Sequence, residues 1–168
     1  MIVPRKNTPA PVPVPPDQIR SALVVLGCPE IPVQQALAID LAYNLRKTGF
    51  DVLFAGNPSV LGLLTVSDPE RHYLQKMMVL EKCIEEIVEG GRRAHLCMVL
   101  AHNDAGISYA ATMRHLLPES RLVVIVFGKN PGPLLELITF PCETIAEKAV
   151  HGPGVLRKKI HGVFGWAA

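Results

Sequence analysis

The chain has 168 residues and a mass of 18.3 kDa, which is the usual size of a single domain. Hydrophobic residues make up 49% of it and charged residues 19%, which excludes disorder for the body of the chain. The net charge of +2 excludes a general nucleic-acid-binding protein, because such binding needs a clustered basic excess.

No segment of the sequence has the pattern of a membrane or export signal. A signal peptide needs a basic start followed by an apolar stretch, and a membrane span needs roughly 20 apolar residues; neither pattern is present. The cysteines are too few for a disulfide scaffold and form no C-x-x-C pair; they are Cys28, Cys83, Cys97 and Cys142. We therefore expect a cytoplasmic protein with reduced thiols and no membrane partner.

Residues 1–20 form a proline-rich segment, which we expect to be an extended tail before a single α/β domain of residues 21–168. Its prolines are Pro4, Pro9, Pro11, Pro13, Pro15 and Pro16. Proline fixes φ and lacks an amide hydrogen, so this segment favours a polyproline-like or disordered state over a helix or a central strand. It fits a spacer, a contact to a neighbouring subunit, or a ligand for a proline-binding groove.

From Ser21 onward, short apolar runs alternate with stretches of helical periodicity. The pattern predicts strands over 22–27, 51–55, 96–101, 122–127 and 143–150, and helices over 33–48, 57–66, 79–89, 104–117, 133–138 and 155–164. Residues 73–78 fit a strand-like arm or an early helical turn. This alternation predicts a three-layer α/β/α sandwich of the Rossmann-like kind, with a mostly parallel sheet of about five strands. An antiparallel direction stays open for the last strand.

The helix predicted over 33–48 is apolar on nearly all sides. Such a helix needs cover from the sheet and from another helix or a subunit. Together with the high apolar share of the chain, this pattern makes a homo-oligomer, most simply a dimer, the expected assembly.

The polar residues that follow the predicted strands define the candidate site. In parallel α/β sheets, ligands bind outside the carboxyl ends of the strands, so we expect these residues to meet at one edge. The predicted ligand-binding residues are Gly27, Glu30, Asn57, Asn103, Asp104, His151, Gly152 and Gly154. Main-chain N–H groups of residues 27–30 and 152–154 would hold an anion, such as a nucleotide or a phosphorylated cofactor.

Cys28 and His102 are the candidate catalytic residues. Cys28 precedes a helix start, where the helix dipole favours a thiolate, and His102 ends a strand, where it fits a general base, a metal ligand or a phosphate donor. The structural alternatives are a small residue at a tight strand end and a histidine bonded to the next helix cap. Asn103 and Asp104 have their own structural alternative, because one of them caps the helix that follows.

The segment from His151 to Lys159 places Arg157, Lys158 and Lys159 in the first turns of a helix. Cations there oppose the helix dipole, and a bound phosphate or carboxylate would relieve that conflict; a solvated basic turn is the alternative. No G-x-G-x-x-G follows the first strand, and neither a P-loop nor a G-x-S-x-G motif is present. No resident metal is expected; a site made of Cys28, His102 and His151 would be the weaker alternative.

Five short strings carry a family resemblance over residues 23–140: V-L-G-C-P-E, A-G-N-P-S-V-L, S-D-P-E-R-H-Y, H-N-D-A and V-F-G-K. On these strings the chain resembles an uncharacterised family of small α/β proteins from methanogenic archaea, known only as a domain of unknown function. The resemblance implies a three-layer, Rossmann-like fold and a role in or near one-carbon or cofactor metabolism. It transfers no catalytic residues, and it covers neither the proline-rich tail nor the residues after about Phe140.

Two functions fit the sequence. The first is the binding of a small anionic ligand at the carboxyl edge of the sheet, with thiol chemistry at Cys28. The second is a non-catalytic homodimeric or partner-binding module accessory to methanogen metabolism. The sequence does not decide whether the protein is an enzyme, and it names no cofactor.

Overall fold

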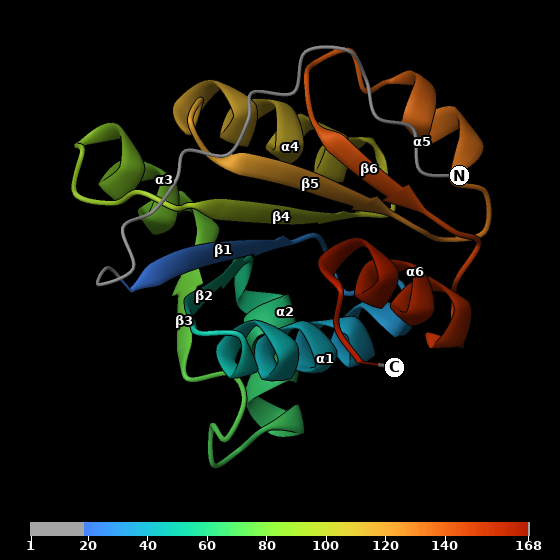
Figure 1. Cartoon of the computed structure of the whole chain (residues 1–168), viewed down its shortest axis with the longest axis horizontal. Helices are drawn as coiled ribbons and strands as arrows, with labels where there is room; N and C mark the ends of the chain where they lie inside the picture. The colour runs from blue at the N-terminus through green and yellow to red at the C-terminus, as the bar shows by residue number, and fades with distance from the viewer. Residues whose placement is uncertain (1–18, 168) are drawn as a thin grey trace.

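The structure is a computed structural model that describes residues 19–167. Within this part, one parallel sheet has the strand order β3-β2-β1-β4-β5-β6 (Figure 1). The strands are β1 (Arg20–Leu26), β2 (Phe50–Gly56), β3 (Lys76–Val79), β4 (Leu96–Ala101), β5 (Arg121–Val126) and β6 (Glu143–Ala146). The expected Rossmann-like α/β architecture is confirmed.

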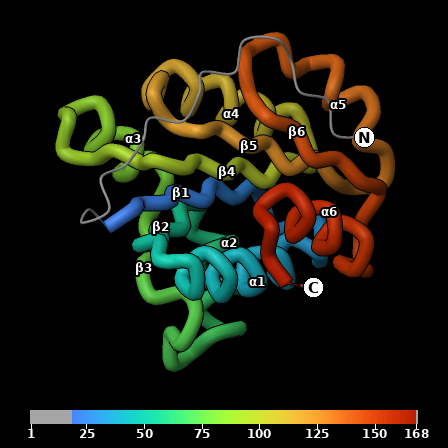
Figure 2. Tube along the Cα trace, viewed as in Figure 1, coloured from blue at the N-terminus to red at the C-terminus, as the bar shows by residue number. Residues whose placement is uncertain are grey.

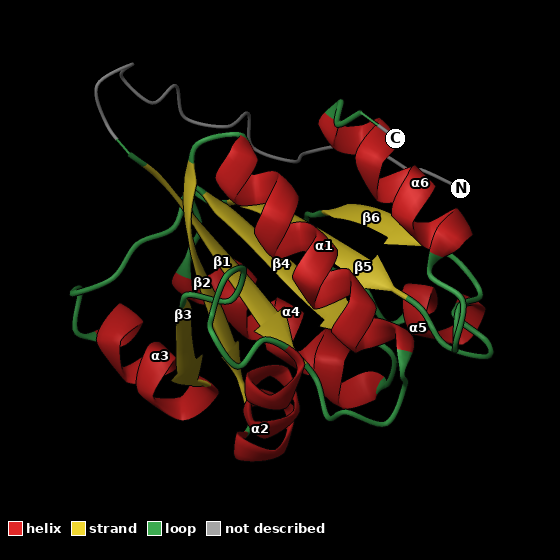
Figure 3. Ribbon diagram, turned by 90° about the horizontal axis from the view of Figure 1, so that it is seen from below, coloured by secondary structure: helices red, strands yellow, loops and turns green. Residues whose placement is uncertain are grey.

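Helices cover both faces of the sheet. They are α1 (Val33–Lys47), α2 (Pro58–Ser67), α3 (Leu80–Val88), α4 (Asp104–Leu116), α5 (Gly132–Glu136) and α6 (Gly154–Phe164). Residues of α1, α2 and α6 pack in the core on one face, and residues of α3 and α4 pack on the other, where α5 also lies (Figures 1 and 3). None of these helices is long and apolar enough to cross a membrane.

The strand order changes direction between β1 and β4. The chain builds outward from β1 to β2 and β3, and α3 then carries it back so that β4 pairs with the other side of β1. Because right-handed crossovers place α1 and α2 on one face and α4 on the opposite face, the loops after β1 and β4 separate at their carboxyl ends. This is the point at which open α/β sheets bind ligands.

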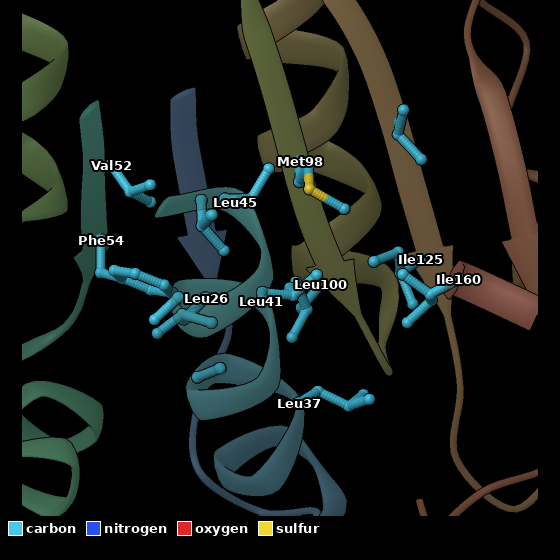
Figure 4. Packing of buried hydrophobic residues seen from close by; sticks show 14 of the residues in the cluster. Leu26, Leu37, Leu41, Leu45, Val52, Phe54, Met98, Leu100, Ile125 and Ile160 are labelled. Carbon is cyan, nitrogen blue, oxygen red and sulfur yellow. The ribbon is translucent and has the colours of Figure 1, made fainter. Parts of the chain in front are cut away.

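Helix α1 is covered by other parts of the chain that the structure describes. Its Leu37 and Leu41 are fully buried, and they share a core cluster with Ile160 of α6 (Figure 4). Figure 2 shows the traces of α1 and α6 side by side, although more than a hundred residues separate them in the sequence. The expectation that α1 is covered by the sheet and by a second helix is therefore confirmed. That second helix is α6 of the same chain rather than a helix of another subunit.

Two sequence predictions about strands need correction. The sheet has six strands rather than about five, because residues 73–78 contribute the edge strand β3 from Lys76 onward. That strand, K-M-M-V, has no buried residue and no β-branched run, so its sequence lacks the strand signal. The strand predicted over 143–150 ends at Ala146 and runs parallel; beyond it, Ala149 makes only an isolated antiparallel bridge with Gly128.

Candidate functional site

The loops after β1, β5 and β6 are joined at the carboxyl edge of the sheet. The amide of Val33, at the start of α1, donates to the carbonyl of Val150 over 2.9 Å, so the loop after β6 reaches the start of α1. Gly128 and Ala149 exchange two backbone hydrogen bonds of 3.0 and 3.1 Å. The segments with the predicted site residues therefore lie along one edge.

Cys28 is the exposed thiol at this edge, while Cys83, Cys97 and Cys142 are buried. The side-chain amide of Asn57, which follows β2, donates to Cys28 Sγ over 3.2 Å. The other end of the same amide, Oδ1, accepts from the amide of Val60 over 2.9 Å and caps α2. The cap fixes the amide so that its N–H donor meets the sulfur.

Gln34 holds the turn that carries Cys28. Its side chain is buried in the first turn of α1, where Oε1 accepts from the amide of Gly27 over 3.2 Å and Nε2 donates to the carbonyl of Gly27 over 3.1 Å. Nε2 also approaches the carbonyl of Cys28 at 3.4 Å. The end of β1 is thereby paired by a side chain instead of a neighbouring strand, which leaves the Cys28 side chain facing outward.

His102 lies beneath this turn. Its side chain is only 2% exposed, and its ring stacks on Phe127 with centroids 5.6 Å apart. A Cβ on Gly27 would lie 3.2 Å from His102 Cε1, so the glycine leaves room for the imidazole. Burial lowers the pKa of His102 below its ordinary value, and the nearby Glu30 carboxylate offsets this only in part. The lowered pKa favours the neutral form of the His102 imidazole.

Neither ring nitrogen of His102 has a hydrogen-bond partner among the described residues. Nε2 lies 3.4 Å from Oε2 of the exposed Glu30 side chain, which is a close approach rather than a hydrogen bond. A buried polar group without a partner costs about 1–3 kcal/mol, so this imidazole needs an explanation beyond packing.

Two of the predicted binding residues have structural roles. Oδ1 of Asn103 accepts from the amide of Gly106 over 3.0 Å and caps α4, and the exposed Asp104 bonds to the amide of Ala105. Two of the main-chain N–H groups in the 27–30 turn, which were expected to bind an anion, already donate hydrogen bonds within the protein. The amide of Gly27 is bonded to Gln34, and the amide of Glu30 donates to the carbonyl of Cys28 over 2.9 Å.

The loop before α6 supplies His151, Gly152 and Gly154, all of which are exposed. Helix α6 begins without a side-chain cap and without an acidic residue in its first turn. Two of its three early cations have internal partners: Arg157 bonds to Asp40 over 2.7 Å, and Lys159 bonds to Glu147 over 2.7 Å. The charge conflict at this helix start is therefore mostly relieved within the protein.

No group of three or more histidine, cysteine, aspartate or glutamate side chains in residues 19–167 is arranged to hold a metal ion. In particular, the weaker alternative of a metal held by Cys28, His102 and His151 has no cluster of ligands to support it.

One buried polar cluster was not predicted from the sequence. His161 of α6 is buried, and its Nε2 lies 2.8 Å from Oδ2 of Asp40 on α1, while its Nδ1 lies 3.1 Å from the carbonyl of Ala167. Asp40 also accepts from Nε of Arg157. The only signal for this cluster was Asp40 itself, a charge placed on a helix that is otherwise apolar nearly all round. The cluster joins α6 to α1 and lies away from Cys28.

Comparisons with known proteins agree with the fold. A family model described as Domain of unknown function (DUF1890) matches residues 23–163. An uncharacterized protein of Methanocaldococcus jannaschii, MJ0452, is 34% identical over 114 residues, which cover 66% of this chain and 72% of that protein. The solved structure of MT0777 is 36% identical, covers 86% of this chain and 97% of its own, and superposes with a TM-score of 0.78. The family resemblance of the sequence motifs is thus confirmed: the chain belongs to the DUF1890 family, whose domain has no assigned function.

Proposed function

We propose that the protein binds a small anionic ligand, such as a nucleotide or a phosphorylated cofactor, at the carboxyl edge of the sheet where β1 and β4 separate. The ligand would lie over the 27–30 turn, with the Cys28 thiol against it and His102 beneath it. The observation that carries this proposal is the buried imidazole of His102 under an exposed turn: neither of its nitrogens has a hydrogen-bond partner among residues 19–167, although Nε2 lies 3.4 Å from Oε2 of Glu30.

The exposed position of Cys28 favours a chemical role for its thiol over a purely structural one. Cys28 is exposed and receives the Asn57 amide on its sulfur. Among the buried cysteines, burial raises the pKa of Cys97 to about 12 and also raises the pKa of Cys83. A neutral imidazole such as His102 is the form that can accept a proton, and a thiolate is the form that attacks an electrophile. Nucleophilic chemistry at Cys28 is the finer part of the proposal.

The helix starts support negative charge on the ligand. Each of the six described helices follows a parallel strand and so begins at this edge, and the amino ends of helices carry positive partial charge. Glu30 and Asp104 are exposed near the starts of α1 and α4 and would repel an anion. We therefore expect the anionic group to lie toward the start of α6, beside His151 and Gly154, where no acidic residue is present in the first turn.

The test is a thermal-shift titration of the full chain with ADP, ATP and pyrophosphate. A specific ligand stabilises the folded state by RT ln(1 + [L]/Kd), about 2.7 kcal/mol when its concentration is 100 times Kd. We expect stabilisation by at least one of these ligands, with a weaker effect in His151→Ala and little change in His115→Ala, a substitution of an exposed histidine on α4. No stabilisation by any of the three would contradict the anionic ligand.

The thiol needs a separate test, because a ligand can bind without reacting. In the native chain, iodoacetamide should modify Cys28 faster than the same cysteine in the urea-unfolded chain at equal pH. Cys28→Ser should remove this reaction, while Cys83→Ser should leave its rate unchanged. A native rate no higher than the unfolded rate would remove the nucleophilic part of the proposal and leave the binding part standing.

A second candidate function is a homodimeric module, favoured by the composition of α2. This helix, P-S-V-L-G-L-L-T-V-S, contains no charged residue, and it exposes 39% of Leu63 and 80% of Val66. Exposed apolar helix faces are common at self-association surfaces. Light scattering of the full chain should then give twice the monomer mass, and Val66→Lys should return it to the monomer mass. A monomer at high concentration would count against this function.

A further inference from the structure

The outer side of α1 carries two hollows that share a pair of tyrosines. One hollow, of about 410 Å³, lies against Ala36, Ile39, Pro153 and Arg157; the other, of about 670 Å³, lies against Ile19 and Phe50. Tyr43 of α1 and Tyr73 of the loop before β3 line both hollows. We call the two hollows together the tyrosine groove. The second hollow lies at the end of the strands opposite to Cys28, whereas the first hollow reaches Pro153, which lies between Gly152 and Gly154 of the candidate site.

The two tyrosines are exposed yet held in place. Tyr43 is 48% exposed and Tyr73 is 41% exposed, and their rings meet edge to face with centroids 6.2 Å apart. The backbone of Tyr73 is fixed, because its amide donates to the buried carboxylate of Asp68 over 2.8 Å, and Arg46 of α1 donates to the carbonyl of the preceding residue, His72. The result is a preformed aromatic wall that faces outward.

The sequence that precedes the described residues ends at this groove. Ile19, the first described residue, is 78% exposed and lines the second hollow. The six residues 11–16 read P-V-P-V-P-P, and only Asp17 and Gln18 separate them from Ile19. Grooves lined by aromatic rings are the usual receptors for polyproline II segments, since such segments lose little entropy on binding.

Length and charge both permit this segment to lie in the groove. Ala36 and Tyr43 lie seven residues apart on α1, which is roughly 10 Å along the helix axis. A polyproline II segment advances about 3.1 Å per residue, so residues 11–16 would span roughly 19 Å, enough to pass both tyrosines. Asp17 would enter beside Arg46 and Lys47, which line the second hollow.

We propose that the tyrosine groove is the docking site for the proline-rich segment 1–18 of the same chain, with residues 11–16 against Tyr43 and Tyr73. This inference is independent of the ligand proposed at the carboxyl edge. It gives the proline-rich segment a binding partner within its own molecule and gives the groove a single occupant.

Photo-crosslinking of the full chain tests the proposal. With p-benzoylphenylalanine at Tyr43, peptides from residues 1–18 should be the main crosslinked partners; with the same residue at Tyr109, on the opposite face in α4, crosslinks to them should be several-fold fewer. Equal crosslinking from the two positions would overturn the proposal. A mixture of ¹⁴N- and ¹⁵N-labelled chains separates the sources, and crosslinks that are mostly between isotopes would overturn docking within one chain.

A second measurement avoids any change to the groove. Replacing Pro11, Pro13, Pro15 and Pro16 together by Ser in the full chain should raise the nitration rate of Tyr43 and Tyr73 by tetranitromethane several-fold, and leave that of Tyr109 unchanged. Unchanged nitration at Tyr43 and Tyr73 would overturn the role of the prolines.

Discussion

Gln34 is a buried side chain whose polar contacts within residues 19–167 are with the backbone of the 27–28 turn. Gln34→Ala would leave the N–H and C=O of Gly27 buried without partners, which costs about 1–3 kcal/mol. We expect the free energy of unfolding, measured by urea denaturation, to fall by about that amount. The matched control is Gln35→Ala, whose side chain bonds to Ser67 at an exposed site; a loss below about 0.5 kcal/mol is expected there.

The same substitution tests whether the turn positions Cys28. Without Gln34 the turn loses its anchor, so the iodoacetamide rate of Cys28 should move toward that of the unfolded chain. An unchanged rate together with an unchanged unfolding free energy would show that the backbone holds the turn without the glutamine.

Asp68 links stability to pH. Burial pushes the pKa of this carboxyl up, but hydrogen bonds from the amides of Leu74, Tyr73 and His72 outweigh it, so the pKa is lower in the folded state. A depressed folded pKa contributes stability that is complete above the ordinary aspartate pKa of about 4 and is lost as the pH falls below it. Asp68→Asn, which carries no charge at any pH, should remove this dependence.

The measurement is the free energy of unfolding of both chains from about pH 6 to about pH 3. The wild-type chain should be the more stable at the upper end, and the difference should shrink toward the lower end. A difference that stays constant over this range would mean that the Asp68 carboxyl has the same pKa in the folded and unfolded states.

At the scale of the elements, α4 packs so closely against β4 that position 106 has no room for a side chain. A Cβ built on Gly106 would lie 2.8 Å from Ala101 Cα and 2.9 Å from Ala101 Cβ. Gly106→Ala should therefore destabilise the fold by about 1–3 kcal/mol through overpacking, less the gain of about 1 kcal/mol in helix propensity. Gly62→Ala on α2, where a Cβ meets nothing within 4 Å, should instead stabilise the fold by about 0.5–1 kcal/mol.

The expected changes in stability of the two glycine variants have opposite signs, so comparing them tests how closely α4 packs against β4. Both substitutions change a helical glycine to alanine, so propensity alone predicts the same gain for each. Thermal denaturation that showed equal gains would mean that α4 shifts away from β4 at little cost.

The elements that the sequence predicted well are those with a strong local signal. The strand at 96–101 was predicted with the bounds of β4, because a continuous apolar run leaves little choice. The sequence of edge strand β3 fits either a strand or a helical turn, because its pairing with β2 comes from tertiary position and not from its own residues. In the site, the edge carrying Cys28 and His102 followed from topology, whereas the contacts of Gln34 and His161 depend on segments that only the fold brings together.

At the scale of the whole molecule, the strand order predicts where the fold opens first. Strands β4 and β5 are flanked on both sides by other strands and are almost completely buried, whereas β3 is an edge strand with no buried residue. Amides in the centre of such a sheet exchange with solvent only through global unfolding, and amides at an edge exchange through local opening.

Hydrogen exchange of the full chain, followed by mass spectrometry, should therefore show the slowest exchange in peptides from β4 and β5 and much faster exchange in those from β3. Strand β6 is the internal comparison: it is also an edge strand, but three of its four residues are buried. We expect it to exchange more slowly than β3, because α6 packs against it and is tied to α1 through His161 and Asp40. If the amides of β3 exchanged as slowly as those of β4, a partner would have to cover the edge of β3. The homodimeric module would then become the better proposal for the function of the protein.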